Sequence, residues 1–309
     1  MKTNKKNDLI QFQFNLYVNF DIPSGNNIIQ FSRPDSETLT CYSMTSQIAL
    51  VLALTFLINL ITTLSYSVRI VGIRTGRIAV SFALFNILVL VSRTANGFQA
   101  PLLASTIEKN INSGAGSNLL DFRLIILSCT ISTVFGGLLI PTFQRVLSIA
   151  VDKFSIYKSV PKVLVYSLSK SGISSIKENI VIPSAKNITA VDLKNDFPWK
   201  VFIMNVVAVA IITIGVLSSL YAGYFNPEFR TTASSLSAII NGFSTILMFV
   251  FIDPFLSVMT DDVVLGKTSE SRFRRYIVYM VFARVIGTLI AQIILIPAAK
   301  IIALVAGMI

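Results

Sequence analysis

Residues 201–225 read VFIMNVVAVAIITIGVLSSLYAGYF and contain no Asp, Glu, Lys or Arg. A helix of this length is about 37 Å long at 1.5 Å per residue, which exceeds the roughly 30 Å of hydrocarbon in a bilayer. Lipid offers the backbone no hydrogen-bond partners, so a helix that satisfies its own polar groups is the structure expected of such a run. This stretch is therefore predicted to span a membrane.

Five further apolar blocks reach the roughly 20 residues that a membrane-spanning helix needs. They lie at 46–66, 78–104, 124–143, 233–257 and 276–306. None shows the two-residue alternation that is typical of barrel strands. The chain is thus expected to be an all-α integral membrane protein with about six transmembrane helices. The last block contains Pro297, which fits either one bent helix or a span followed by a short interfacial helix.

The composition agrees with this class. Of the 309 residues 53% are hydrophobic and 13% charged, whereas a soluble domain carries about a quarter charged residues. A net charge of +11 would suggest nucleic acid in a soluble protein. Here the basic residues lie between apolar blocks, so we expect membrane lipids as partners and no nucleic acid. With no histidine and two cysteines, we expect no metal, no cofactor and no catalytic residue.

Lysine and arginine predict the orientation. Most of them lie in three connections, 67–77, 144–200 and 258–275, whereas the opposite loops hold few. The positive-inside rule places these connections in the cytoplasm and both ends of the membrane domain outside. The longest polar stretch, 151–199, also carries apolar residues near helical spacing. It is interpreted either as an interfacial helix or as a solvated linker helix.

Residues 1–43 do not fit the membrane pattern. The lysines near the start are not followed by the apolar core of a signal peptide. We expect a disordered tail or a misassigned start, with Met44 as a sufficient first residue and 44–309 as the membrane domain.

The two halves of the membrane domain show weak sequence similarity to each other. A shift of 156 residues aligns Pro141 with Pro297, and a shift of 153 aligns Pro101 with Pro254. One interpretation is a duplicated unit of three helices, which must form an inverted 3+3 repeat because three is odd. The other is chance similarity among apolar residues.

Arg284 is the most informative polar residue. It lies eight residues into the last block, or about 12 Å deep when the helix enters at Tyr276. A guanidinium at that depth must face the bundle, a cavity or a partner, and no acid lies at a matching depth. An unpaired arginine suits an anion, above all a phosphate. The alternative is that it bonds backbone carbonyls near Gly287 or extends to the interface.

Other polar residues form a second group of candidates. Arg93, Asn86 and Asn241 join Arg284 as substrate-binding candidates, although snorkelling and interhelical hydrogen bonds explain them as well. A basic collar at the cytoplasmic mouth either attracts anionic headgroups or only sets topology; its members are Arg69, Arg74 and Arg77. The candidates for lining a cavity are Asn59, Gln99, Asp253 and Gln292.

Enzyme signatures are nearly absent. Asp261 and Asp262 fit either a magnesium ion beside a polyprenyl phosphate or, more simply, a solvated helix end.

Several long stretches resemble the Amj family of lipid II flippases, the alternate to MurJ. They are LSYSVRIVGIRTGR at 64–77, LFNILVLVSRTANGFQAP at 84–101, RTTASSLSAIING at 230–242, IDP at 252–254 and RVIGTLIAQ at 284–292. The resemblance runs from about Met44 to the C-terminus and is far more specific than any short motif.

The resemblance implies a flippase that moves undecaprenyl-diphosphate-linked peptidoglycan precursor, lipid II, from the inner to the outer leaflet of the bacterial cytoplasmic membrane. It implies a role in cell wall synthesis, and contact with the cell wall synthesis machinery is a further hypothesis. Three alternatives remain at this point: a flippase for another polyprenyl-linked glycan, a membrane enzyme that acts on polyprenyl phosphates through Asp261 and Asp262, and a scaffold for envelope synthesis.

Overall fold

The computed structural model describes residues 27–29, 42–114, 116–159, 162–163, 165–166, 169–181 and 197–309. It divides into two compact units, Met1–Leu50 and Val51–Ile309. In the first unit, strand β1 (Asn27–Ile29) pairs antiparallel with β2 (Tyr42–Met44). Most of the predicted tail, residues 1–43, lies outside the described residues.

Six helical segments are long and apolar enough to cross a membrane, which confirms the predicted all-α membrane class. They are α1 (Ser46–Thr75), α2 (Ile78–Asn112), α3 (Leu119–Tyr157), α7 (Trp199–Phe225), the continuous run of α8 (Arg230–Leu247), η1 (Met248–Ile252) and α9 (Asp253–Val264), and α10 (Glu270–Ala306). A short helix, α5 (Lys170–Glu178), lies in the long connection.

The helices extend beyond the apolar blocks that predict them. α1 continues to Thr75 and α3 to Tyr157, so much of the predicted loops 67–77 and 144–200 is helical. Helices project beyond hydrocarbon because hydropathy marks only the part that lies in lipid. Only Gly76 and Arg77 separate α1 from α2; Gly76 takes φ +64°, and the Arg77 amide donates to the Gly72 carbonyl at 3.0 Å.

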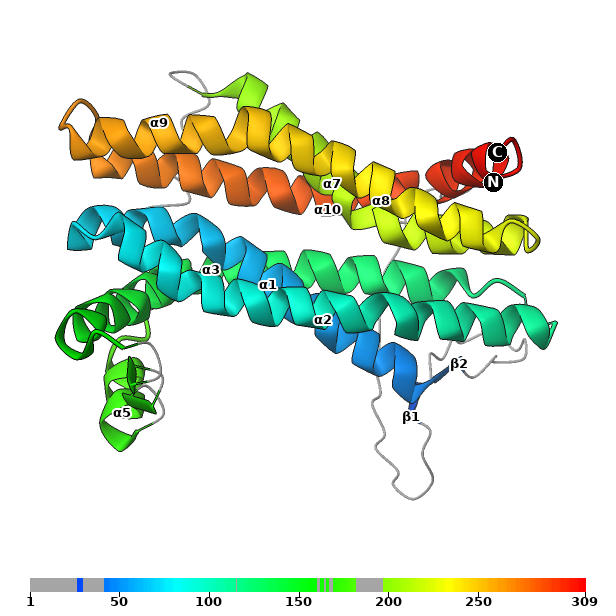
Figure 1. Ribbon diagram of the computed structural model, residues 1–309, viewed down its shortest axis with the longest axis horizontal. Helices are drawn as coiled ribbons and strands as arrows, with labels where there is room; N and C mark the ends of the chain where they lie inside the picture. The colour runs from blue at the N-terminus through cyan, green and yellow to red at the C-terminus, as the bar shows by residue number, and fades with distance from the viewer. Residues whose placement is uncertain are drawn as a thin grey trace, which may run out of the picture. The chain divides into compact units, whose positions relative to one another are not determined.

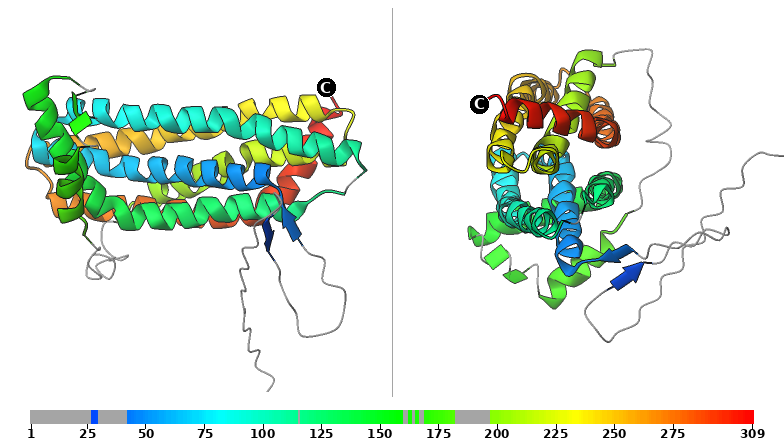
Figure 2. Two further views of the ribbon diagram at one scale, coloured as in Figure 1. Left: turned by 90° about the horizontal axis from the view of Figure 1, so that it is seen from below. Right: turned by 90° about the vertical axis from the view of Figure 1, so that its right-hand side faces the viewer.

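Two prolines act differently. α10 is continuous through Pro297. Figure 2 shows that its C-terminal part, in red, lies across the bundle rather than along it, so a bent helix and a terminal segment that crosses the bundle are both present. In the fifth span, the π-helical turn η1 comes directly before Asp253 and Pro254. Because proline has no N–H to donate to the preceding turn, a local widening of the helix at this point is expected.

The spans of the second unit form two groups of three (Figure 1). α1, α2 and α3 lie together, and α7, α8–η1–α9 and α10 form the other group, as the end-on view of Figure 2 also shows. Within each group, serine hydroxyls tie neighbours to the backbone of the first helix. Ser132 of α3 donates to the Phe56 carbonyl of α1, and Ser244 of α8 donates to the Ala208 carbonyl of α7 at 2.6 Å. This grouping is compatible with a 3+3 repeat.

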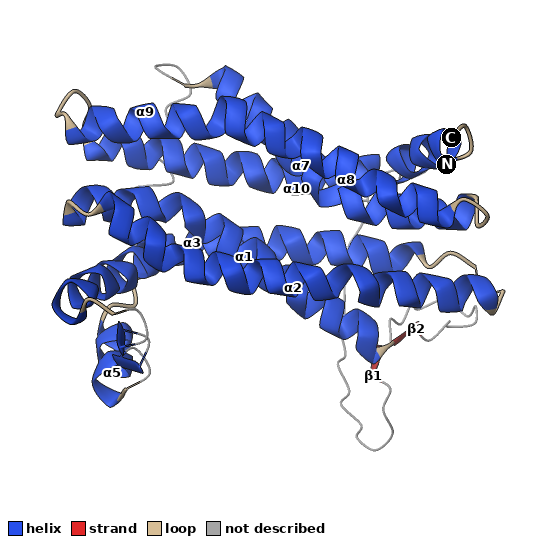
Figure 3. Cartoon of the chain, in the orientation of Figure 1, coloured by secondary structure: helices blue, strands red, loops and turns tan. Residues whose placement is uncertain are grey.

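Helices α7 and α10 approach closely at Gly287. A Cβ built there would lie 2.8 Å from the Val206 carbonyl oxygen and 2.9 Å from the Val209 Cβ. Small residues allow such contacts in membranes, where packing and hydrogen bonds drive helix association. This contact lies one turn from Arg284 and fixes the helix that carries it. Figure 3 shows the same view coloured by secondary structure, with the helices in blue.

Candidate functional site

Arg284 lies deep inside the bundle and is only 4% exposed. It is fourteen residues, or about 21 Å, from the start of α10, because that helix begins before the apolar block. Its Nη2 donates to Asn59 Oδ1 of α1 at 3.1 Å, whereas its buried Nε has no hydrogen-bond partner. No carboxylate of the described residues forms an ion pair with it. A neutral amide oxygen is a weak partner for a buried cation, so the guanidinium keeps capacity for an anion.

Asn59 connects Arg284 to a polar network across the first three helices. Its Nδ2 donates to the Thr55 carbonyl at 3.0 Å and to Cys129 Sγ of α3 at 3.2 Å. Gln99 of α2 donates to Thr55 Oγ1 at 2.7 Å. The structure thus brings together three sequence candidates, Arg284, Asn59 and Gln99, and adds Thr55 to them.

A second buried polar cluster lies one turn from Arg284. Asn205 of α7 is fully buried and donates through Nδ2 to the Met280 carbonyl at 3.0 Å and to the Tyr66 hydroxyl at 3.4 Å. These contacts join α1, α7 and α10. They hold together the two groups of helices beside the arginine. Tyr66 and Asn205 were not among the predicted site residues, although an asparagine inside the most apolar span is a usable signal.

The three arginines of the predicted basic collar do not form one continuous basic surface, because Arg69 and Arg74 each belong to a different ion pair. Arg69 pairs with Asp253 at 3.5 Å and donates to Ser257 Oγ at 2.9 Å, and its guanidinium carbon lies 5.4 Å from the Phe82 ring centroid. Its side chain is only 16% exposed. Arg69 of the predicted collar and Asp253, a candidate for lining a cavity, are therefore ion-pair partners, because helix packing places the two side chains together.

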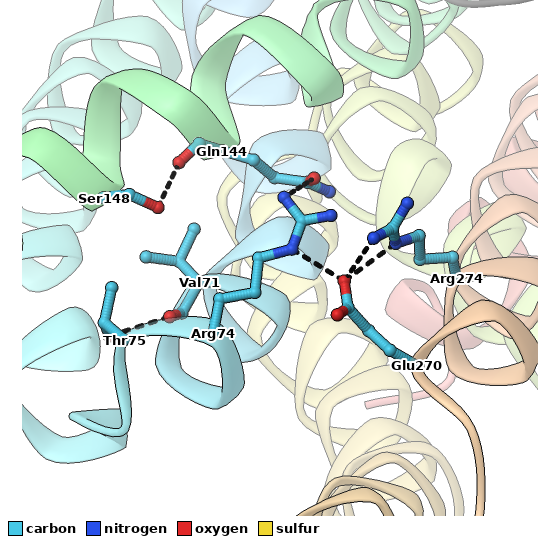
Figure 4. Close-up of polar contacts among 7 residues, drawn as sticks. All are labelled: Val71, Arg74, Thr75, Gln144, Ser148, Glu270 and Arg274. Atoms are coloured by element: carbon cyan, nitrogen blue, oxygen red, sulfur yellow. Dashed lines mark hydrogen bonds and ion pairs between the residues drawn. The ribbon is translucent and has the colours of Figure 1, made fainter.

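Arg74 is also engaged, in the cluster drawn in Figure 4. Its Nε donates to Glu270 Oε1 at 2.6 Å and its Nη1 to Gln144 Oε1 at 3.4 Å. Arg274 donates to the same Glu270 oxygen through Nε at 2.9 Å. Glu270 and Arg274 were missed, although their i,i+4 spacing at a helix start was visible in the sequence. Arg77 is exposed.

The remaining candidates are scattered. Asn86 and Arg93 lie on an exposed side of α2, and no hydrogen bond of the described residues joins them to Arg284. Asn241 of α8 packs on Gly215 of α7, and its buried Oδ1 has no partner. Gln292 of α10 donates to the Arg123 carbonyl of α3 at 2.9 Å, so it ties helices together.

The two aspartates of the enzyme alternative lie in the last turn of α9. Asp261 is exposed and Asp262 half-buried. Within the described part of the chain, they do not belong to any group of three or more His, Cys, Asp or Glu residues that could hold a metal ion.

The amino-acid sequence of this chain matches a known protein family. The family model described as Amj, alternate to MurJ, matches residues 54–306. The chain belongs to the Amj family. The lipid II flippase Amj of Bacillus subtilis strain 168 is 37% identical over 266 residues, which cover 84% of this chain and 97% of that protein. No solved structure matches the chain.

The Amj match confirms the resemblance and covers the whole polar network. Thr55, Asn59, Gln99, Cys129 and Arg284 all lie inside the matched range. So do the two ion-pair clusters at Arg69 and Arg74. The strands β1 and β2 of this Amj protein lie before it.

Proposed function

We propose that this protein is a lipid II flippase of the bacterial cytoplasmic membrane, which moves undecaprenyl-diphosphate-linked peptidoglycan precursor from the inner to the outer leaflet. The relative from Bacillus subtilis carries that name and matches along nearly its full length. The observation on which the mechanism rests is Arg284, a buried guanidinium with a neutral partner and an unpartnered Nε.

The cargo carries negatively charged oxygens, and these are the partners that Arg284 does not find among the described residues around it. A diphosphate offers acceptor oxygens at the spacing of the planar guanidinium fork. In this mechanism the sugar–peptide headgroup passes through the bundle while the polyprenyl tail stays in lipid. Arg284 binds the diphosphate, and Asn59 holds the guanidinium between transport cycles. Gln99 and Thr55 keep Asn59 in position.

The membrane potential favours transport in this direction. The cell interior is negative, so outward movement of about two negative charges across about 100 mV releases on the order of 4–5 kcal/mol.

Complementation tests the function directly. The chain is expressed in bacteria depleted of their own lipid II flippases, and outward lipid II is measured together with growth. We expect growth to be restored and lipid II to reach the outer leaflet. A chain that inserts stably at normal abundance but restores neither would refute the proposal, and restored surface export of a different polyprenyl-linked glycan alone would support the related cargo instead.

Orientation is a separate prediction. With the basic connections in the cytoplasm, a cysteine in place of Ser174, which lies exposed in α5, should be protected from an impermeant thiol reagent in intact cells. One in place of Asn112, exposed at the end of α2, should be labelled. Both variants are made in a chain with Cys41 and Cys129 replaced by serine, and permeabilised cells serve as control. Labelling of the Ser174 variant in intact cells would reverse the assigned orientation.

A further inference from the structure

The cluster of Arg74, Glu270 and Arg274 has the geometry of an anion site. Two guanidiniums from different helices converge on a single oxygen, Glu270 Oε1. Arg74 comes from the last turn of α1 and Glu270 from the first turn of α10. The side chains of Arg74, Glu270 and Arg274 are 32%, 30% and 49% exposed, so water and ligands reach them. Figure 4 shows the two arginines on either side of the carboxylate.

The charges of the cluster do not balance. Two cations share one carboxylate, and all three donor contacts fall on the same oxygen. A ligand with two or more negative charges and several oxygens therefore suits the two guanidiniums better than one carboxylate does.

The start of α10 supplies a second favourable feature. Glu270 occupies the first turn of a 37-residue helix, where a negative charge interacts well with the helix dipole. Ser269 Oγ also accepts from the Arg272 N–H at 3.3 Å, so the first turn is capped independently of Glu270. Displacement of Glu270 thus leaves the helix end compensated.

We propose that Arg74 and Arg274 form a diphosphate-binding site at the cytoplasmic mouth, in which Glu270 occupies the place of the ligand until the ligand displaces it. The ligand is the diphosphate of a polyprenyl-linked lipid, so this inference rests on the proposed function. It differs from the Arg284 site, which lies about 21 Å further along α10.

Binding at this site has a consequence for the helices. The Arg74–Glu270 ion pair joins α1 of one helix group to α10 of the other, and Gln144 of α3 extends the contact. A diphosphate that takes both arginines breaks this connection between groups. Cargo arrival then loosens the cytoplasmic end of the bundle, through which the headgroup must pass.

The test measures equilibrium binding of undecaprenyl diphosphate to the full chain in nanodiscs of neutral phosphatidylcholine. Arg74→Gln and Arg274→Gln should each weaken binding by about tenfold, because each removes a charged donor fork. Glu270→Gln should tighten it by about tenfold, because the competing carboxylate is gone. Arg275→Gln is the matched control, an exposed arginine of the same helix outside the cluster, and should change binding less than about twofold. The same measurements in an Arg284→Gln background isolate this site from the buried one.

The gain expected for Glu270→Gln decides the outcome, since a misfolded variant cannot bind more tightly. Unchanged or weaker binding by that variant would overturn the proposal. Equal displacement of the probe by phosphatidylglycerol would overturn the diphosphate assignment and indicate a site for ordinary anionic phospholipid. If Glu270→Gln does not bind more tightly but the chain still complements flippase-depleted cells, only this site is rejected. If Glu270→Gln binds more tightly but the chain does not complement these cells, only the proposed function is rejected.

Discussion

Replacing Arg284 with alanine is expected to reduce outward transfer of lipid II by about tenfold to a hundredfold while the protein stays inserted. A charge-assisted hydrogen bond contributes about 1.5–3 kcal/mol, and 1.4 kcal/mol corresponds to a factor of about ten. The buried guanidinium and its unpartnered Nε motivate this size of effect. The measurement is outward lipid II per molecule of membrane-inserted protein in flippase-depleted cells.

Conservative variants separate binding of cargo from a role in packing. Glutamine can still donate to Asn59 but carries no charge, so Arg284→Gln should be stable yet lose about as much transport as the alanine variant. Lysine keeps the charge without the planar fork and should restore transport only in part. Lys300→Gln, an exposed charge change on the same helix, is the control and should transport normally. Normal transport by a stably inserted Arg284→Gln protein would show that the residue only ties α10 to α1.

Replacing Gly287 with leucine is expected to lower the free energy of unfolding by about 1–3 kcal/mol or more. The first carbon of the new side chain would meet the Val206 carbonyl oxygen at 2.8 Å, and backbone of α7 cannot rotate out of the way as a side chain can. Helices α7 and α10 must then separate beside Arg284. Thermal unfolding in detergent and abundance in the membrane both report the change.

The matched control for this variant is Gly242→Leu. Gly242 lies exposed in α8, and a Cβ built there meets nothing within 4 Å. Leucine there is expected to change stability by less than about 0.5 kcal/mol, or to raise it slightly because helices disfavour glycine. Similar unfolding temperatures for the two leucine variants would contradict the close contact between α7 and α10.

Much about the candidate site could be predicted from residue type and depth alone. Arg284 was selected because a cation inside the apolar block 276–306 must face the bundle, a cavity or a partner. In the structure it is buried and has no carboxylate partner among the described residues. Asn59 and Gln99 were selected as polar residues in spans, and the network contains both. The same reasoning also selected Asn86 and Arg93, which lie on an exposed side of α2.

Contacts between distant residues could not be predicted in this way. Arg69 pairs with Asp253 and Arg74 with Glu270, partners that lie far away in the sequence, 196 residues apart in the second case. Both arginines were predicted to belong to a basic collar at the cytoplasmic mouth, from the charge of their connection, and no partners were predicted for them. Their partners depend on how α1 lies beside α9 and α10, which no local pattern reveals.

The sequence by itself determined the number and type of the spans, because a helix in lipid satisfies its backbone alone and needs only enough apolar residues. The tertiary structure decided which face of each helix packs and which polar groups meet. In a membrane, apolar side chains suit the lipid and the protein interior equally, so hydropathy does not separate the two faces. The packing of the helices is determined instead by specific contacts between them. Examples are the close approach of Gly287 to Val206 and the hydrogen bond from Arg284 to Asn59.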